Sequence, residues 1–472
     1  MDNQNFLENE KKSGILDWYV EGVPIWRFER FMVHRYLHEK DINSNFCSEV
    51  TQEYKKGQLS RILKLFFKYR LKPHRKTDVL IFDHRRRVLE NGKYVCKYTE
   101  FISDFYQDSI TFEVPYNDSH LEPAKTKNLY YLDRLILRSY AYAFIIRKFN
   151  KKRYINAQNQ IKDKLIEFTE NSYTDDTYNY LTKALTKNLF LIKYRKKNIK
   201  KLINSISPKI ILEVVGYSQN NMIINEVARE LKIPSVELQH SQINPDLIQY
   251  NWGDRKDIEQ FPEYLFTFGE FWSSDMHMPI SEEHIKAVGF PYFEKGIQEA
   301  RKKGKNESLE CDVLFISQFL AGVSVYKLAM EYSELNPNTK IVYKLHPEEY
   351  LIWEERYLKL KEYPNITVIT DSNISLYECF VNTKAVVGVF SGALYEALAF
   401  DLPVYLYNAD YIEYMQKLID VNGAIVVDSA KELDKCLKEG IKAQLPDLEI
   451  WKKDSKNNIF KEIDIIKEEV NR

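Results

Sequence analysis

The sequence predicts an α/β protein in which two Rossmann-like domains face a cleft, preceded by an extra, mainly helical N-terminal segment. Short apolar runs alternate with amphipathic segments in two separate series along the chain, a pattern typical of doubly wound parallel sheets. The chain has 472 residues, more than a single hydrophobic core usually accommodates. We therefore expect two sheets, each with helices on both faces.

The two series and their flanks define four predicted parts. These are a helical segment over 1–76, a first Rossmann-like domain with a helical insertion over 77–288, a second over 289–447, and a C-terminal helix over 448–472 that packs across both domains. In the first domain, apolar runs at 78–82, 211–215 and 236–240 predict buried strands. In the second, we expect strands in CDVLFIS, KIVYKL, ITVIT, AVVGV and PVYLY, and a helix over 348–360.

Composition excludes several classes of protein. Lys plus Arg (68) balances Asp plus Glu (68), so net charge gives no reason to expect a nucleic-acid partner. The five cysteines are far apart without a C-x-x-C pair, which indicates neither a zinc site nor a disulfide framework. The N-terminus is polar, and charged or turn-forming residues interrupt the apolar stretch 385–407. We expect a cytoplasmic protein.

One basic, aromatic stretch suggests a location at a membrane. Residues 61–76, RILKLFFKYRLKPHRK, combine positive charge with apolar side chains, as segments that lie on anionic membranes do. A solvated linker helix explains the same pattern. The expected localisation is thus cytoplasmic, with peripheral contact at the inner face of the plasma membrane as the second possibility.

The segment YKLHPEE is the most informative candidate site. Lys344 and His346 share one face of a predicted strand, and Pro347 biases His346 toward extended geometry. Both side chains are then delivered at the carboxyl end of the strand, where open α/β sheets bind ligands. A lysine supplies positive charge and a histidine donates a hydrogen bond or proton to a departing phosphate. A surface loop with a chance His-Pro pair is the alternative.

A second candidate segment is GVFSGALYEALAF. An apolar strand leads into a turn with Ser391 and Gly392 and then into a helix, where free N–H groups favour a phosphate. Glu396 lies one turn into the helix, within reach of ribose hydroxyls, and Tyr395 is a candidate for the wall of the base or sugar pocket. An ordinary helix capped by Ser391 is the alternative.

Two shorter signals complete the predicted nucleotide-sugar site and its acceptor side. In ISQF, Ser317 and Gln318 end the first strand of the second domain, where contacts with the diphosphate or sugar are expected. In VELQH, His240 ends a strand of the first domain and is a candidate base for an acceptor hydroxyl, since its unperturbed pKa lies near 6.5. Glu213 and Glu237 are alternative bases, or nucleophiles in a retaining reaction.

Several motifs are missing from the sequence. It contains no Asp-x-Asp pair, no G-x-x-x-x-G-K-[ST] loop and no G-x-G-x-x-G after a strand. The absence of these motifs argues against a kinase, a dinucleotide oxidoreductase and a metal-dependent transferase. We expect neither a bound cofactor nor a metal requirement.

Taken together, LQH, VGFPYFE, KLHPEE and SGALYEALAFDLPVYLY resemble segments of bacterial GT-B glycosyltransferases of capsule and lipopolysaccharide assembly, over roughly residues 205–410. The His-Pro and serine motifs are similar to those of sialyl-, polysialyl- and Kdo-type transferases that use CMP-activated nonulosonic acids. That resemblance implies that His346 contacts or protonates the CMP phosphate and that Ser391 holds it. The chain departs from the pattern at Ser241, where a glycine is usual, and at Gly392, where a second serine is usual.

The resemblance implies a metal-independent, inverting GT-B glycosyltransferase. It would move a nonulosonic acid of sialic, pseudaminic or Kdo type from a CMP-sugar to an oligosaccharide or lipid-linked glycan acceptor in capsular or lipopolysaccharide synthesis. The histidines also resemble those of polymerases that use CDP-glycerol, so a polyol-phosphate transferase is the first alternative. A non-catalytic scaffold of glycan assembly is the second.

Overall fold

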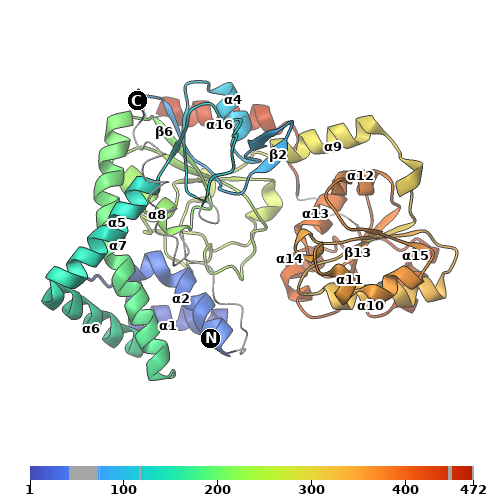
Figure 1. The fold of residues 1–472 in the computed structure, drawn as a ribbon, viewed down its shortest axis with the longest axis horizontal. Helices are drawn as coiled ribbons and strands as arrows, with labels where there is room; N and C mark the ends of the chain where they lie inside the picture. Colours follow the sequence, from blue (N-terminus) through green and yellow to red (C-terminus); the bar gives the residue numbers. More distant parts are fainter. Residues whose placement is uncertain (42–72, 74, 116–118, 445–448, 470–472) are drawn as a thin grey trace. The chain divides into compact units, whose positions relative to one another are not determined.

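The computed structural model describes residues 1–41, 73, 75–115, 119–444 and 449–469. Most of the basic stretch 61–76 lies outside the described residues. The chain forms two compact units, one comprising Met1–Phe268, Trp272–Gly289 and Asp454–Arg472, the other Gly269–Phe271 and Phe290–Lys453. Each is built around its own parallel sheet (Figure 1). No helix among the described residues is both long and apolar enough to span a bilayer.

The first unit contains a seven-stranded sheet in the order β5-β4-β1-β6-β7-β8-β9, with every neighbouring pair parallel. Counted along the chain without the separate β2–β3 hairpin, this is the Rossmann order 3-2-1-4-5-6 with one added strand. The strands are β1 (Val79–Phe82), β2 (Val88–Glu90), β3 (Lys93–Val95), β4 (Ile110–Glu113), β5 (Leu129–Tyr131), β6 (Ile210–Val214), β7 (Ser235–Leu238), β8 (Tyr264–Thr267) and β9 (Ile285–Ala287).

Helices cover both faces of this sheet. In β1, Leu80 and Phe82 belong to one apolar cluster, shared with the long helices, whereas Val79 and Ile81 belong to another, shared with the C-terminal helix. The alternation follows from the two-residue period of a strand. The helices of this unit are α1 (Asn3–Ser13), α2 (Ile25–Asp41), α4 (Glu100–Phe105), α5 (Asp133–Phe149), α6 (Lys151–Phe168), α7 (Asp175–Ile206), α8 (Gln219–Glu230) and α16 (Ser455–Glu469).

The N-terminal helices are part of the first core. Trp26 is buried and packs on Phe168 of α6 at 4.4 Å between ring centroids. Its indole N–H donates to Glu10 at 2.6 Å, and Arg30 donates to the same carboxylate at 2.7 Å. The described part of the N-terminal segment is helical, as predicted, and its aromatic side chains serve mainly as core.

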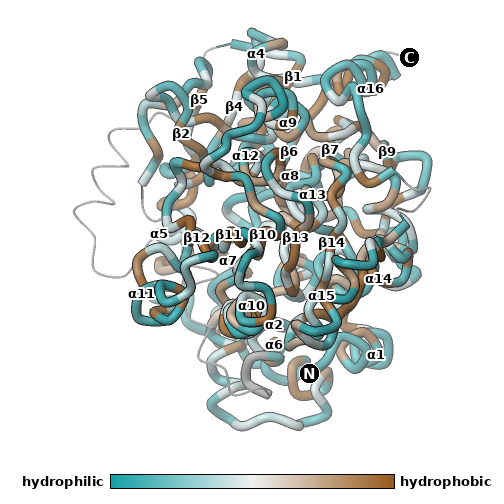
Figure 2. Tube along the Cα trace, turned by 90° about the vertical axis from the view of Figure 1, so that its right-hand side faces the viewer, coloured by the Kyte–Doolittle hydropathy of each residue, from teal (hydrophilic) through white to brown (hydrophobic). Residues whose placement is uncertain are grey.

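The second unit contains a six-stranded parallel sheet in the order β12-β11-β10-β13-β14-β15. In Figure 2 the labels β12, β11, β10, β13 and β14 follow one another in this order. Numbered from β10, the order is 3-2-1-4-5-6, the Rossmann order. The elements are α9 (Pro291–Lys303), β10 (Val313–Ile316), α10 (Gly322–Leu335), β11 (Ile341–Lys344), α11 (Trp353–Arg356), β12 (Ile366–Ile369), α12 (Leu376–Val381), β13 (Ala385–Gly388), α13 (Gly392–Leu398), β14 (Val404–Tyr407), α14 (Gln416–Asp420), β15 (Ile425–Val427) and α15 (Ala430–Glu439).

The prediction of two doubly wound Rossmann-like sheets with N-terminal helices is confirmed. The helix predicted over 348–360 is wrong. That segment instead forms two 3₁₀ turns, Pro347–Glu349 and Leu358–Glu362, on either side of the one-turn helix α11. The reason is local: Glu349 folds back onto the backbone of His346, which closes the first turn as a capping box.

A buried ionic network closes the carboxyl end of the first sheet. Arg87 contacts Asp83 after β1 and Glu113 at the end of β4, and donates to Thr126 at 3.0 Å. His120 bridges Glu113 and Asp133 at 2.7 and 2.8 Å. Burial lowers the pKa of His120, but its hydrogen bonds to the two carboxylates outweigh burial and raise it.

We expect Arg87→Met to lower the free energy of unfolding by about 3–5 kcal/mol, because removing one partner leaves buried carboxylates uncompensated. Arg75→Met is the matched control. Arg75 pairs with Asp108 across a largely exposed contact, so its loss should cost less than about 1 kcal/mol. Urea denaturation followed by circular dichroism measures both. Equal losses in the two variants would contradict a stabilising role for the network.

Candidate functional site

His346 follows β11 at the carboxyl edge of the second sheet, with extended backbone angles (φ −69°, ψ 144°). Its backbone N–H donates to Glu349 Oε2 at 2.9 Å, and its Nδ1 accepts from the backbone N–H of Glu348 at 3.3 Å. An imidazole whose Nδ1 accepts a hydrogen bond carries its proton on Nε2. The ring is partly exposed, so the Nε2–H is a donor at the surface of this edge.

A buried network of hydrogen bonds and charged groups stabilises the turn that carries His346. Glu349 is fully buried and accepts a hydrogen bond from the Tyr357 hydroxyl, while Arg356 lies 3.6 Å from its Oε1. A Cβ added at Gly322 would come within 2.0 Å of the Tyr357 hydroxyl and 2.5 Å of Glu349 Oε1. Only glycine therefore fits at the start of α10 while this network is in place.

Ser317 and Lys344 lie on adjacent strand ends next to His346. The Ser317 N–H donates to the Lys344 carbonyl at 2.9 Å, and its buried hydroxyl lies 3.2 Å from the Tyr343 hydroxyl. The Lys344 ammonium donates to the Asp371 carbonyl at 2.7 Å and the Tyr350 hydroxyl at 3.1 Å. Lys344 thus ties the ends of β11 and β12 together, and its predicted contact with a phosphate remains a prediction.

Ser391 and its neighbours follow β13, the strand on the other side of β10. The Ser391 hydroxyl accepts from the Ala393 N–H at 3.2 Å and caps α13, and Gly392 is exposed. Glu396 is half-buried, whereas Tyr395 is buried against Phe271 at 5.8 Å between centroids. Tyr395 is therefore a core side chain in this structure.

These strand ends meet at the topological switch point of the second sheet. β10 pairs with β11 on one side and with β13 on the other, so the loops carrying Ser317, His346 and Ser391 leave the same edge at neighbouring positions. Gln318 follows Ser317, and its Oε1 is buried without a hydrogen-bond partner among the described residues. Ligands of open α/β sheets bind at such a point.

His240 occupies the corresponding edge of the first sheet, two residues after β7. Its Nε2 lies 3.3 Å from the Tyr217 hydroxyl, its carbonyl accepts from the Tyr98 hydroxyl at 2.8 Å, and its buried Nδ1 lies 3.9 Å from Glu237 Oε1. Burial, with a smaller effect of the neighbouring His84, lowers the pKa of His240 to about 3. The ring is therefore neutral near pH 7, and Glu237 is the carboxyl group nearest to its Nδ1.

Glu213 and Glu237 are register partners on β6 and β7, and both side chains are completely buried. Asn225 donates to Glu213 at 2.8 Å and Tyr250 to Glu237 at 2.7 Å, whereas Glu213 Oε2 has no partner among the described residues. Burial raises the pKa of Glu237 to about 7, and burial together with Glu237 raises that of Glu213. Neither carboxylate meets solvent, so neither contacts an acceptor directly in this structure.

Sequence reasoning missed several residues of this cluster. A Cβ at Gly216 would lie 2.5 Å from Glu237 Oε2 and 2.9 Å from Glu213 Oε1, so glycine is required where the two carboxylates converge. Tyr217, Asn225 and Tyr250 supply the hydroxyl and amide groups around them. The available signals were the Gly-Tyr pair one residue beyond a strand and an asparagine on the buried face of a helix.

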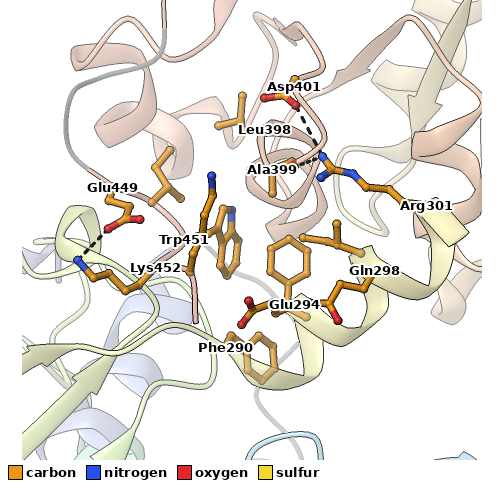
Figure 3. A pocket seen from close by; sticks show the side chains of 14 residues that line it. Phe290, Glu294, Gln298, Arg301, Leu398, Ala399, Asp401, Glu449, Trp451 and Lys452 are labelled. Atoms are coloured by element: carbon orange, nitrogen blue, oxygen red, sulfur yellow. Dashed lines mark hydrogen bonds and ion pairs between the residues drawn. The ribbon is translucent and has the colours of Figure 1, made fainter. Parts of the chain in front are cut away.

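A cavity of about 460 Å³ lies in the second unit away from the predicted residues. Its walls come from α9 and the residue before it, from the end of α13 with the segment that follows, and from residues 449–453. Figure 3 shows Arg301 reaching toward Asp401 and Ala399. α13 begins at the carboxyl edge of the sheet and ends before β14 starts, so Asp401 lies at the opposite edge from Ser391. We assign no function to this cavity. The described residues contain no cluster of three or more His, Cys, Asp or Glu suited to a metal.

No protein-family model and no curated protein sequence matches the chain. Solved structures with a similar fold include the UDP-GlcNAc 2-epimerase of Methanocaldococcus jannaschii, at 14% identity over 83% of this chain and 99% of that one, with a TM-score of 0.49. Another is the wall teichoic acid polymerase TagF, at 11% identity over 94% and 98%, with a TM-score of 0.44. A third is the glycotransferase of kitacinnamycin, at 11% identity over 84% and 96%, with a TM-score of 0.40. Likeness at this level assigns no activity to the chain.

The buried glutamate pair predicts how stability depends on pH. A carboxyl group whose pKa is raised in the folded state binds its proton more tightly there than in the unfolded chain, so its stabilising effect is lost as pH rises through the folded pKa. We expect the free energy of unfolding to fall between pH 6 and pH 8, and Glu213→Gln to reduce that fall. Urea denaturation at both pH values measures it.

The exposed Glu439→Gln on α15 is the control for that experiment, and its pH dependence should match that of the unmodified protein. A Glu213→Gln variant with an unchanged fall would show that Glu213 does not hold a proton in this pH range.

Proposed function

We propose that this protein is a glycosyltransferase that moves a nonulosonic acid from a CMP-sugar to a glycan acceptor of capsular or lipopolysaccharide synthesis. The observation that carries the proposal is His346, held at the switch point of the second sheet with its Nε2–H exposed and its Nδ1 and backbone occupied. A hydrogen-bond donor fixed at this position suits a phosphate that gains negative charge as it departs. The sequence motifs resemble those of CMP-sugar transferases, and this resemblance is the reason for proposing a CMP-linked donor.

In this proposal the second unit binds the donor. Ser391 follows β13 at the switch point, and its hydroxyl donates to a phosphate oxygen. Ser317, whose hydroxyl is buried beside that of Tyr343, shapes the end of β10. Gly392 is exposed, so a phosphate can approach the backbone closely there. Gln318, Lys344, Pro347 and Glu396 shape the same edge, with Lys344 holding the β11 and β12 ends together.

The first unit supplies the base. The acceptor hydroxyl attacks the anomeric carbon, the bond from that carbon to the phosphate oxygen breaks, and the hydroxyl proton passes to Nε2 of His240. The carboxyl group of Glu237 lies 3.9 Å from the Nδ1 of His240. Glu237 is in this scheme a positioning residue that acts through His240, and attack from the face opposite the phosphate inverts the anomeric centre.

Two other functions remain as candidates. The presence of one histidine at the carboxyl edge of each sheet also suits transfer of a polyol phosphate from CDP-glycerol, the first alternative. A non-catalytic scaffold of glycan assembly would keep the fold without turnover, because fold alone does not define activity. A donor panel separates the three.

We expect CMP-sialic, CMP-pseudaminic or CMP-Kdo donors to raise the melting temperature and to be turned over with a glycan acceptor, with unchanged rates in EDTA. CDP-, UDP- and GDP-linked donors are the comparison. Protection and turnover with CDP-glycerol alone would replace the proposal with the first alternative. The absence of turnover with every donor, alongside binding of the acceptor glycan, would support the scaffold.

Substitution of the two histidines should separate donor from acceptor chemistry. His346→Ala should lower kcat by about 10²–10⁴-fold, the usual size of a general-acid effect, and reduce protection by the nucleotide. His240→Ala should lower kcat similarly while protection by the nucleotide stays normal. Full activity of either variant would reject the role assigned to that histidine.

Glu349→Gln tests whether the His346 turn must be held in place. The amide keeps the size of the side chain but weakens its bonds to the His346 backbone and Tyr357, so we expect kcat to fall at least tenfold with little change in KM for the donor. Glu355→Gln is the matched control on the neighbouring helix α11, since Glu355 is exposed. Equal kinetics in the two variants would show that the capping box has no part in catalysis.

A further inference from the structure

The end of α5 and the start of α6 form an exposed, apolar and basic surface on the first unit. Phe144, Ile145, Phe149 and Ile155 are 61%, 50%, 75% and 41% exposed. We call residues 144–155 the α5–α6 elbow; both helices lie at the left edge of Figure 1. Four large apolar side chains are thus open to solvent within twelve residues of sequence. Such a concentration marks an interaction site.

The charge of this region has one sign. Between Asp133 and Asp163 the chain contains eight Lys and Arg and no Asp or Glu. Arg147, Lys148, Lys151 and Lys152 are exposed, and none of them takes part in an ion pair with another described residue. Glu21, which reaches the region from the N-terminal segment, is already bound by Arg153 and Lys193.

Cations and aromatic rings are interleaved at the elbow. The Lys148 ammonium lies 5.4 Å from the centroid of the Phe149 ring and 6.0 Å from that of Phe144. The buried face of the same helices packs on α7, since Ile136 and Ala143 of α5 and Ile161 of α6 belong to the core. Packing therefore fixes the helices and leaves the opposite face with its apolar and basic side chains outward.

We propose that the α5–α6 elbow docks the protein on an anionic lipid surface. The two phenylalanines and two isoleucines enter the boundary between head groups and acyl chains, and the four cations bind lipid phosphates. The aliphatic side chains favour a lipid surface over a nucleic acid. The bases of a nucleic acid stack on aromatic rings, but a nucleic acid has no hydrocarbon layer into which isoleucine side chains can insert. This inference does not rest on the proposed transferase activity.

The test is co-sedimentation of the full chain with vesicles of phosphatidylcholine alone and of phosphatidylcholine with phosphatidylglycerol in equal parts. We expect binding to the anionic vesicles only, weakened by salt. Lys151→Glu with Lys152→Glu should lower the affinity at least tenfold, since each cation near an anionic surface contributes roughly a fivefold factor. Phe144→Ser with Phe149→Ser should lower it by a similar amount, and circular dichroism confirms that both variants remain folded.

The matched controls make the same kinds of substitution outside the elbow. Lys431→Glu with Lys435→Glu changes two exposed lysines on α15 by the same charge, and Leu89→Ser removes an exposed apolar side chain from the β2–β3 hairpin. Both controls should bind like the unmodified protein. Elbow variants that bind as tightly as the controls would assign any membrane contact to another part of the chain, such as residues 61–76, and would overturn the proposal.

Two other results would also overturn it. The first is equal binding to both kinds of vesicle, or to neither. The second is a dimer in size-exclusion chromatography with light scattering that Phe144→Ser with Phe149→Ser converts to a monomer, because the elbow would then be an interface between two copies of the chain.

Discussion

Parallel pairing of β10 with β11 on one side and β13 on the other is the constraint on which the second unit depends. All strands of a parallel sheet end at the same edge, and the order of these strands reverses direction at β10. Three segments that are far apart in the sequence therefore leave the sheet at neighbouring positions. The same order in the first unit puts the ends of β1 and β6 at the equivalent point.

Buried polar groups stabilise these edges in different ways. Below His346, both carboxylate oxygens of Glu349 accept hydrogen bonds. The result is a fixed turn with one ring nitrogen of His346 left exposed. Around Glu213 and Glu237 the pairing is incomplete, and two carboxylates share a space that only glycine at position 216 allows. The first arrangement suits a group that must hold its geometry, the second a group that must hold a proton.

The fold followed from the sequence more directly than the site did. Runs such as DVLIF and AVVGV are apolar, short and bounded by polar residues, so strands were predictable within a residue or two, and helices between them were predictable from spacing. The segment 348–360 was not, because whether Glu349 continues a helix or folds back depends on Tyr357 and Arg356. Tyr395 has the composition of a pocket residue but faces Phe271, and nothing local distinguishes these two environments.

The sequence by itself determined the two α/β series, the buried aromatic character of the N-terminal segment, and the positions of Ser317, His346 and Ser391 directly after strands. It did so because each depends on periodicity and on neighbours along the chain. Only the tertiary structure decided that Glu213 and Glu237 are buried side by side, that Lys344 turns to Asp371, and that the α5–α6 elbow keeps its apolar side chains outward. Those outcomes depend on strand register and helix packing, which bring together residues with no local relation.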